Sequence, residues 1–288
     1  MIRRPAVAGS FYPGSRDSLL SYIPRLFSSG RGPGEVPDVV VDGERRLFGL
    51  VCPHAGYMYS GEIAAHSFYR LALDGLPDRI VLIGPNHTGL GGAISVYPGG
   101  SWETPLGRVD VDDEFVNELA RVEPFLSLDE DAHLYEHSLE VQIPFLQYIY
   151  SRVGKSFRIV PIIMMYQTLD GMRILGEALY KVIYGSGFGD VVVIASTDFS
   201  HYISASRARE LDDIALKHIL SLDPEGLLNS VYKWNISMCG YGPVATLLYV
   251  ARKVGGMEAR LLKYGHSGEV VGDDSSVVAY ASLAVERV

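Results

Sequence analysis

The sequence predicts an α/β fold: a single domain over residues 1–288 with a central, largely parallel or mixed β-sheet flanked by helices. Two observations lead to this class. Short runs rich in β-branched residues, each bounded by Gly, Pro or Asp, are typical of strands buried on both faces. Segments with apolar residues at helical spacing lie between these runs, and such alternation predicts an α/β sheet.

The predicted elements follow one another along the whole chain. The buried strands are expected at residues 46–53, 78–85, 157–164 and 190–197. Helical spacing predicts helices over residues 60–73, 139–152, 168–185, 205–220 and 242–254. Two further strands are expected at 259–267 and 275–286. Residues 28–45 are rich in Gly and Pro, which indicates a surface connection, and they come too early in the chain to divide two domains.

Composition narrows the classes of function. The net charge of -9 disfavours a nucleic-acid-binding protein, which normally presents a basic face. No apolar run approaches the roughly 18 residues of a membrane span, and no secretory signal pattern opens the chain. The chain has only 2 cysteines, so a disulfide framework is not expected. We therefore expect a cytoplasmic protein without nucleic-acid or membrane partners.

Histidines recur where the predicted strands end. His54 follows the first buried strand, His87 follows the second, and Asp198 and His201 follow the strand at 190–197. Ligands of open α/β sheets bind outside the carboxyl ends of the strands. The pattern therefore predicts one site lined by these four residues.

Two kinds of chemistry use such a cluster. A divalent metal takes neutral imidazoles together with an anionic group, which suits His54 and His87. A histidine beside a carboxylate suits acid–base catalysis, which fits His201 and Asp198. Cys239 stands just before a predicted helix, whose N-terminus favours a thiolate, so it is the candidate third metal ligand. The simpler alternatives are hydrogen-bonded turn histidines and a small buried cysteine.

A second polar group occupies residues 129–144. His133 and His137 are four residues apart and would share a face if they lay on one helix, but the sequence there is more typical of a loop that enters a helix, with Ser138 or a neighbour as its cap. His137 and Glu140 are candidates for lining the pocket or orienting metal ligands. Asp274, before the last strand, is a further pocket candidate or a turn residue.

With these residues in view, the sequence resembles the Memo family. The matching strings include "PHAGYMYSG", "EHSLE", "STDFSHY" and "CGYGP", and they run in order along nearly the whole chain, at residues 6–13, 53–61, 82–87, 136–140, 196–202, 239–243 and 274–281. The resemblance implies a fold similar to that of class III extradiol dioxygenases, which hold non-haem Fe(II) with two histidines and a glutamate.

The resemblance also implies roles for individual residues. His54 and His87 fall on the family's metal-binding histidines, Cys239 on the third ligand, and Asp198 and His201 on the remaining site positions, with His201 in the catalytic-histidine role. A thiolate in place of the dioxygenase carboxylate is a softer ligand that can itself be oxidised, so ring cleavage does not follow from the fold.

Three functions remain open at this stage. The first is a redox enzyme with one divalent or redox metal ion, Fe(II) or copper rather than zinc, acting on a small-molecule or peptide ligand. The second is a zinc metallohydrolase that uses the same residues. The third is a non-catalytic protein that binds a peptide or partner in a vestigial dioxygenase pocket. The resemblance further implies AMMECR-type and radical SAM proteins as partners.

Overall fold

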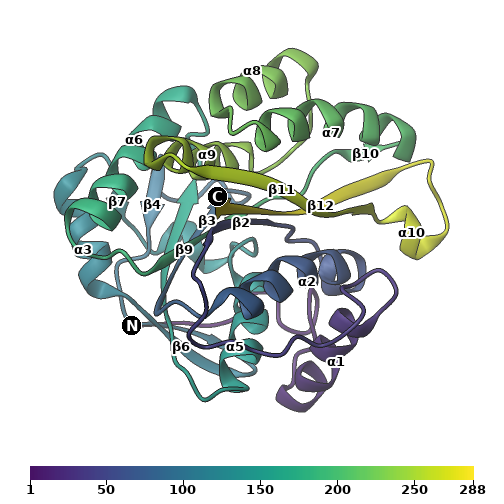
Figure 1. Ribbon diagram of the computed structural model, residues 1–288, viewed down its shortest axis with the longest axis horizontal. Helices are drawn as coiled ribbons and strands as arrows, with labels where there is room; N and C mark the ends of the chain where they lie inside the picture. Colours follow the sequence, from purple (N-terminus) through teal and green to yellow (C-terminus); the bar gives the residue numbers. More distant parts are fainter.

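The computed structural model describes residues 1–288 and contains one mixed sheet of 12 strands (Figure 1). The main path of neighbouring strands is β1-β5-β6-β8-β3-β9-β2-β12-β10, and β11, β4 and β7 join it from the side. The strands are β1 (Ile2–Arg3), β2 (Leu47–Cys52), β3 (Arg79–Pro85), β4 (Ile94–Val96), β5 (Ser101–Thr104), β6 (Gly107–Val111), β7 (Ser127–Leu128), β8 (Arg158–Met164), β9 (Val191–Ser196), β10 (His201–Ile203), β11 (Met257–His266) and β12 (Val277–Arg287).

The centre of the sheet is parallel. β8, β3, β9 and β2 are neighbours in that order and all run in the same direction. Every residue of β2 and β9 is buried, as continuous apolar runs predict for strands covered on both faces. β12 pairs antiparallel with β2, and β11 pairs antiparallel with β12. The single-domain α/β prediction is therefore confirmed, with a mixed sheet.

Helices cover both faces of the sheet (Figure 1). α2 and α5 pack on one face together with α1, while α9 packs on the other face and is covered in turn by α6 and α8. The helices are α1 (Arg16–Ser28), α2 (Tyr57–Asp74), α3 (Asp113–Val122), α4 (Asp131–Leu134), α5 (Ile143–Ser151), α6 (Leu169–Tyr180), α7 (Ala205–Leu220), α8 (Pro224–Trp234), α9 (Tyr241–Val254) and α10 (Gly268–Val271), with a 3-10 turn η1 (Glu140–Gln142) and a π-helical turn η2 (Lys181–Gly185).

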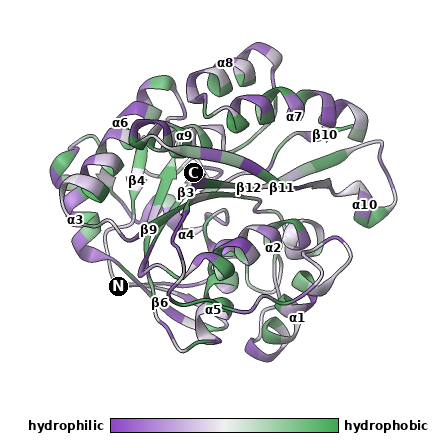
Figure 2. Ribbon diagram, in the orientation of Figure 1, coloured by the Kyte–Doolittle hydropathy of each residue, from purple (hydrophilic) through white to green (hydrophobic).

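One hydrophobic core joins the two layers. A single cluster of 79 buried apolar residues runs through the sheet and both helix layers, which leaves no division into separate domains. Figure 2 shows the central strands as the most hydrophobic part of the molecule, whereas the outer helices carry hydrophilic stretches. No helix is both long and apolar enough to cross a membrane.

Most predicted elements are present, and the differences have local causes. The helix expected over 139–152 is divided into η1 and α5. Ser138 does not cap it: Leu139 is the residue before η1, and the Ser138 hydroxyl donates to the Pro85 carbonyl instead. The helix expected over 168–185 ends in the π-helical turn η2. The segment 28–45 is a connection without helix or strand after Ser28, as predicted.

Candidate metal site

The predicted site residues lie where the parallel strands end. His54 is two residues beyond β2, His87 two residues beyond β3, and Asp198 two residues beyond β9. His201 begins β10, which forms the far edge of the sheet path. Cys239 precedes α9 and reaches the same edge, where its Sγ lies 3.1 Å from Nε2 of His54.

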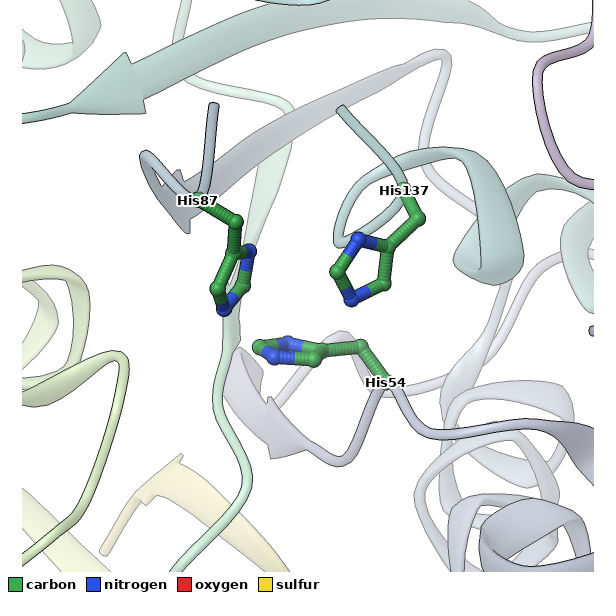
Figure 3. Close-up of side chains that lie close together, drawn as sticks. All are labelled: His54, His87 and His137. Atoms are coloured by element: carbon green, nitrogen blue, oxygen red, sulfur yellow. The ribbon is translucent and has the colours of Figure 1, made fainter. Parts of the chain in front are cut away.

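Three imidazoles meet at this edge: those of His54, His87 and His137 (Figure 3). Each ring offers one nitrogen, and the three nitrogens lie within 4.8 Å of one another. The ring centroids of His87 and His137 are 4.6 Å apart, and that of His54 is 5.2 and 5.4 Å from them. His54 is buried, whereas the side chains of His87 and His137 are 32% and 21% exposed, so the group is reached from solvent past these two rings.

Hydrogen bonds fix the tautomer of His54. The hydroxyl of Ser196 donates its only hydrogen to the carbonyl of Ser138 at 2.7 Å. The 2.8 Å contact between that hydroxyl and Nδ1 of His54 is therefore donated by an Nδ1–H. Nε2 of His54 consequently carries a lone pair, which is the form in which imidazole binds a metal.

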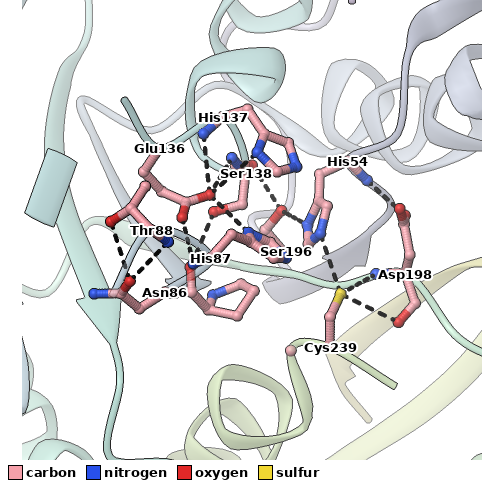
Figure 4. Close-up of polar contacts among 12 residues, drawn as sticks. His54, Asn86, His87, Thr88, Glu136, His137, Ser138, Ser196, Asp198 and Cys239 are labelled. Carbon is pink, nitrogen blue, oxygen red and sulfur yellow. Dashed lines mark hydrogen bonds and ion pairs between the residues drawn. The ribbon is translucent and has the colours of Figure 1, made fainter. Parts of the chain in front are cut away.

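Glu136 takes the corresponding position beside His87. Its carboxylate accepts the Nδ1–H of His87 at 2.9 Å and the backbone N–H of the same residue at 2.7 Å (Figure 4). Since a carboxylate of this kind only accepts hydrogen bonds, His87 must carry its proton on Nδ1. The lone pair of His87 is then on Nε2, as in His54.

Burial keeps two of the imidazoles, those of His54 and His137, neutral. Burial, together with the neighbouring imidazoles, lowers the pKa of His54 well below its ordinary value. Burial also lowers the pKa of His137 to about 4, although the nearby Glu136 carboxylate acts in the opposite direction. Both rings are therefore uncharged at neutral pH and available to a cation.

Asp198 and Cys239 form a second layer around His54. The Asp198 carboxylate accepts the backbone N–H of His54 at 2.8 Å, and the backbone N–H of Asp198 points to Cys239 Sγ at 3.2 Å. Burial raises the pKa of Asp198 to about 6 despite the hydrogen bond from His54. Burial and the Asp198 charge raise the pKa of the Cys239 thiol, so the expected effect of the α9 N-terminus does not prevail and the thiol is protonated without a metal.

His201 lies three residues after Asp198, at the start of β10, and is partly exposed. Its Nδ1–H donates to the carbonyl of Ser237 at 2.7 Å, and its backbone N–H donates to the Ser237 hydroxyl at 2.8 Å. Nε2 of His201 therefore carries the lone pair. Tyr202, the next residue, has a φ of 57° and is 77% exposed, and the pairing of β10 with β12 is irregular between His201 and Ile203.

Two of the predicted pocket residues have other contacts. Glu140 is fully buried and bonded to Arg3, Tyr12 and the backbone N–H groups of Ala6 and Val7, and it contacts none of the three imidazoles. It anchors the N-terminal segment, and its charge acts on His137 from a distance, where it opposes the lowering of that ring's pKa. Asp274 is exposed and lies 3.7 Å from His266.

Two of the polar residues around the imidazoles had no role assigned from the sequence. Ser196 and Glu136 open two of the strings that match the family, but Ser196 reads as the end of a buried strand and Glu136 as a loop residue before a histidine. His133, the other histidine of that segment, is fully buried between the rings of Tyr97 and Trp102, at 5.4 and 5.8 Å. The four-residue spacing of His133 and His137 therefore does not place them on one face.

Known proteins of one family match this chain over nearly its whole length. The model of the family described as "Memo-like protein" matches residues 3–284. A MEMO1 family protein from Ignicoccus hospitalis is 48% identical over 283 residues, which cover 98% of each chain. One from Sulfurisphaera tokodaii is 46% identical over 285 residues, covering 98% of this chain and 99% of the relative.

One solved structure gives a partial match. An uncharacterized protein from Escherichia coli K12 superposes with a TM-score of 0.49 at 14% identity, covering 83% of this chain and 99% of that one. A likeness of this degree carries no argument about function.

Proposed function

The chain belongs to the Memo family, and we propose that it binds one transition-metal ion on His54, His87 and His137. The observation that carries this proposal is the convergence of three imidazole nitrogens within 4.8 Å. Two ligands at about 2.0–2.1 Å from one ion lie at most about 4 Å apart, so an ion would draw the rings slightly inward.

The imidazoles suit a metal ion in their protonation state as well as in their geometry. Nδ1–H of His54 is taken up by Ser196 and Nδ1–H of His87 by Glu136, which leaves both Nε2 lone pairs for a cation. Neutral imidazole is a good ligand for zinc, copper and iron. Cys239 Sγ, 3.1 Å from Nε2 of His54, is close enough to add a soft donor.

The finer proposal is a redox enzyme that uses iron or copper. Its support is the resemblance of the sequence to a family whose fold resembles that of the extradiol dioxygenases, together with the mixed imidazole and thiol surroundings. A bound ion of this kind supplies Lewis acidity and one-electron chemistry. Partly exposed rings at His87 and His137 leave an approach for a small-molecule or peptide ligand.

The protein's own groups then handle protons. Asp198, with a pKa of about 6, exchanges a proton close to neutral pH, and it is held against His54 by the backbone hydrogen bond. His201 has its Nδ1–H committed to Ser237, so its Nε2 accepts a proton from a ligand. We assign His201 and Asp198 to acid–base work and the three imidazoles to metal binding.

A zinc hydrolase is the second candidate. Three protein ligands with an open position are typical of catalytic zinc sites, and three histidines are one known set. The thiol beside His54 also suits zinc. The two candidates use the same residues and differ in the ion, so metal identity separates them.

The metal proposal is tested by measuring the metal content of the purified protein. The protein is purified anaerobically, and bound metals are measured by mass spectrometry for the wild type, His87→Ala and His133→Ala. We expect close to one equivalent of metal in the wild type, its loss in His87→Ala, and its retention in His133→Ala, because His133 lies outside the three-histidine group. A wild type that stays metal-free after anaerobic reconstitution would overturn the proposal.

The redox proposal is tested with matched loaded forms. Iron-, copper- and zinc-loaded protein are compared for O₂ consumption with a panel of small reducing substrates. Uptake by the iron or copper form, absent in the zinc form and in His201→Gln, is the expected result. Hydrolysis of an ester or amide panel by the zinc form alone would favour the second candidate.

A further inference from the structure

Glu136 is a buried carboxylate between two of the three imidazoles. It is 1% exposed, and it accepts the Nδ1–H and backbone N–H of His87 and the backbone N–H groups of His137 and Ser138 (Figure 4). Its Oε1 also lies 3.5 Å from Nδ1 of His137. No other carboxylate lies within 4.0 Å of His87 or His137.

We propose that Glu136 is a positioning residue for the metal site: it holds His87 with Nδ1 protonated and Nε2 free, it anchors the backbone of His137, and its negative charge strengthens cation binding. This inference rests on the proposed metal site. It assigns to Glu136 the part that outer partners of metal-binding histidines commonly play: fixing the ring, fixing the tautomer and raising the basicity of the ligand.

Hydrogen bonds and distances disfavour a direct ligand role for Glu136 in this geometry. Oε1 accepts three N–H groups, from His87 Nδ1 and from the backbones of His137 and Ser138, and Oε2 accepts the backbone N–H of His87. To bind the ion, Oε1 would have to abandon buried donors, which costs about 1–3 kcal/mol for each donor left unsatisfied. Oε2 keeps one lone-pair site, but Glu136 does not belong to the group of ligand atoms that lie within 4.8 Å of one another.

The same count shows why a carboxylate is needed and an amide is not equivalent. If the oxygen of a glutamine took the place of Oε1, its NH₂ group would face the backbone N–H of His87. If the NH₂ group took that place, it would face Nδ1–H of His87 and two backbone donors. The second arrangement favours a proton on Nε2 of His87, which removes the lone pair that the metal needs.

The backbone of Glu136 is itself held by the N-terminus of the chain. Arg3 donates from Nη2 to the Glu136 carbonyl at 2.7 Å and from Nε to the His133 carbonyl at 2.8 Å. Its other contact is the Glu140 carboxylate, at 2.7 Å from Nη1. The position of Glu136 is thus set by contacts that do not involve the three imidazoles of the site.

Glu140 is a matched control on the same segment. It is as buried as Glu136 and also accepts four hydrogen bonds, but from Arg3, Tyr12, Ala6 and Val7 rather than from imidazoles. Glu140→Gln therefore removes a buried carboxylate of equal burial without touching the tautomer of any histidine in the site.

The first test measures zinc affinity by competition with a chelator for the wild type, Glu136→Gln and Glu140→Gln. We expect Glu136→Gln to lose about tenfold to hundredfold in affinity, and Glu140→Gln to stay within about threefold of the wild type. Equal affinities for wild type and Glu136→Gln would overturn the inference. A wild type that does not bind zinc would instead count against the proposed metal site.

The second test needs no variant. Long-range ¹⁵N–¹H correlation spectra of the metal-free wild type report which nitrogen of each histidine carries the proton. The inference predicts an Nδ1–H tautomer for His87, and the opposite tautomer at His87 would contradict it even if zinc binds. The result therefore stands on its own if Glu136→Gln fails to fold.

Discussion

Glu136 and Glu140 are two buried carboxylates four residues apart, and they serve different parts of the molecule. The donors to Glu136 are an imidazole and backbone groups beside the metal site, whereas those to Glu140 include the guanidinium of Arg3 and the phenol of Tyr12. Glu136 thus orients a metal-binding histidine, whereas Glu140 anchors the N-terminal segment. Burial and residue type alone do not separate the two roles; the identity of the donors does.

The largest expected effect concerns the anchoring carboxylate. Glu140→Ala leaves the buried charge of Arg3 without its partner, so we expect a loss of about 3–5 kcal/mol in the free energy of unfolding, measured by urea denaturation. Zinc affinity of the folded protein should change little. The double variant Arg3→Met/Glu140→Ala should lose less than Glu140→Ala, because no unpaired charge remains, and a double variant that is less stable still would contradict this reading.

Ionisation of Glu136 should make the free energy of unfolding depend on pH. Burial alone would raise the pKa of Glu136, but the hydrogen bonds from His87 and the favourable electrostatic interaction with the His87 and His137 rings outweigh it and lower the pKa to about 2. A lowered carboxyl pKa contributes stability above the unfolded value near 4.5, and that contribution is lost as the pH falls toward 2.

Wild type and Glu136→Gln should therefore converge in acid. We expect the difference between their free energies of unfolding to shrink by up to about 3 kcal/mol between pH 5 and pH 2, as followed by urea denaturation of the metal-free proteins. A difference that is constant over this range would show that Glu136 is not ionised more readily in the folded state.

A smaller effect is expected from Ser196, which does for His54 what Glu136 does for His87. Ser196→Ala removes the acceptor for Nδ1–H of His54 without removing a charge. Zinc affinity should fall by about tenfold, the low end of the range for outer partners of ligands. A larger loss than that of Glu136→Gln would reverse the order proposed for the two supports.

The smallest effect is expected at Asp274. Its side chain is 72% exposed and contacts His266 rather than the three imidazoles. Asp274→Asn should change the free energy of unfolding by less than about 0.5 kcal/mol and leave zinc affinity unaltered. A clear loss of zinc affinity would show that the last loop before β12 reaches the site.

The parts of the fold that follow from local pattern were predictable. Continuous apolar runs identify β2, β3, β8 and β9 because a strand buried on both faces has no polar positions. The short strands β4 to β7 have 2 to 5 residues and offer no periodicity to detect. α1 contains Pro24 and a polar face, which weakens its helical pattern.

The site residues at strand ends could be predicted from the sequence, whereas those that reach the site through long-range contacts could not. His54 and His87 follow directly from two buried strands, so the topology rule places them at one edge. His137 joins them from a loop between α4 and η1, held in place by Arg3, which is more than 130 residues away in sequence. Glu140 reads as a pocket residue, and only its contact with the N-terminal segment reveals an anchor.

X-ray absorption spectroscopy of the zinc-reconstituted wild type tests the central claim most directly. The account predicts one zinc ion per chain with three imidazole nitrogens at about 2.0–2.1 Å, and a first shell that loses one imidazole in His137→Ala. A wild-type protein that retains no zinc, or a first shell with fewer than three imidazoles that His137→Ala leaves unchanged, would contradict it.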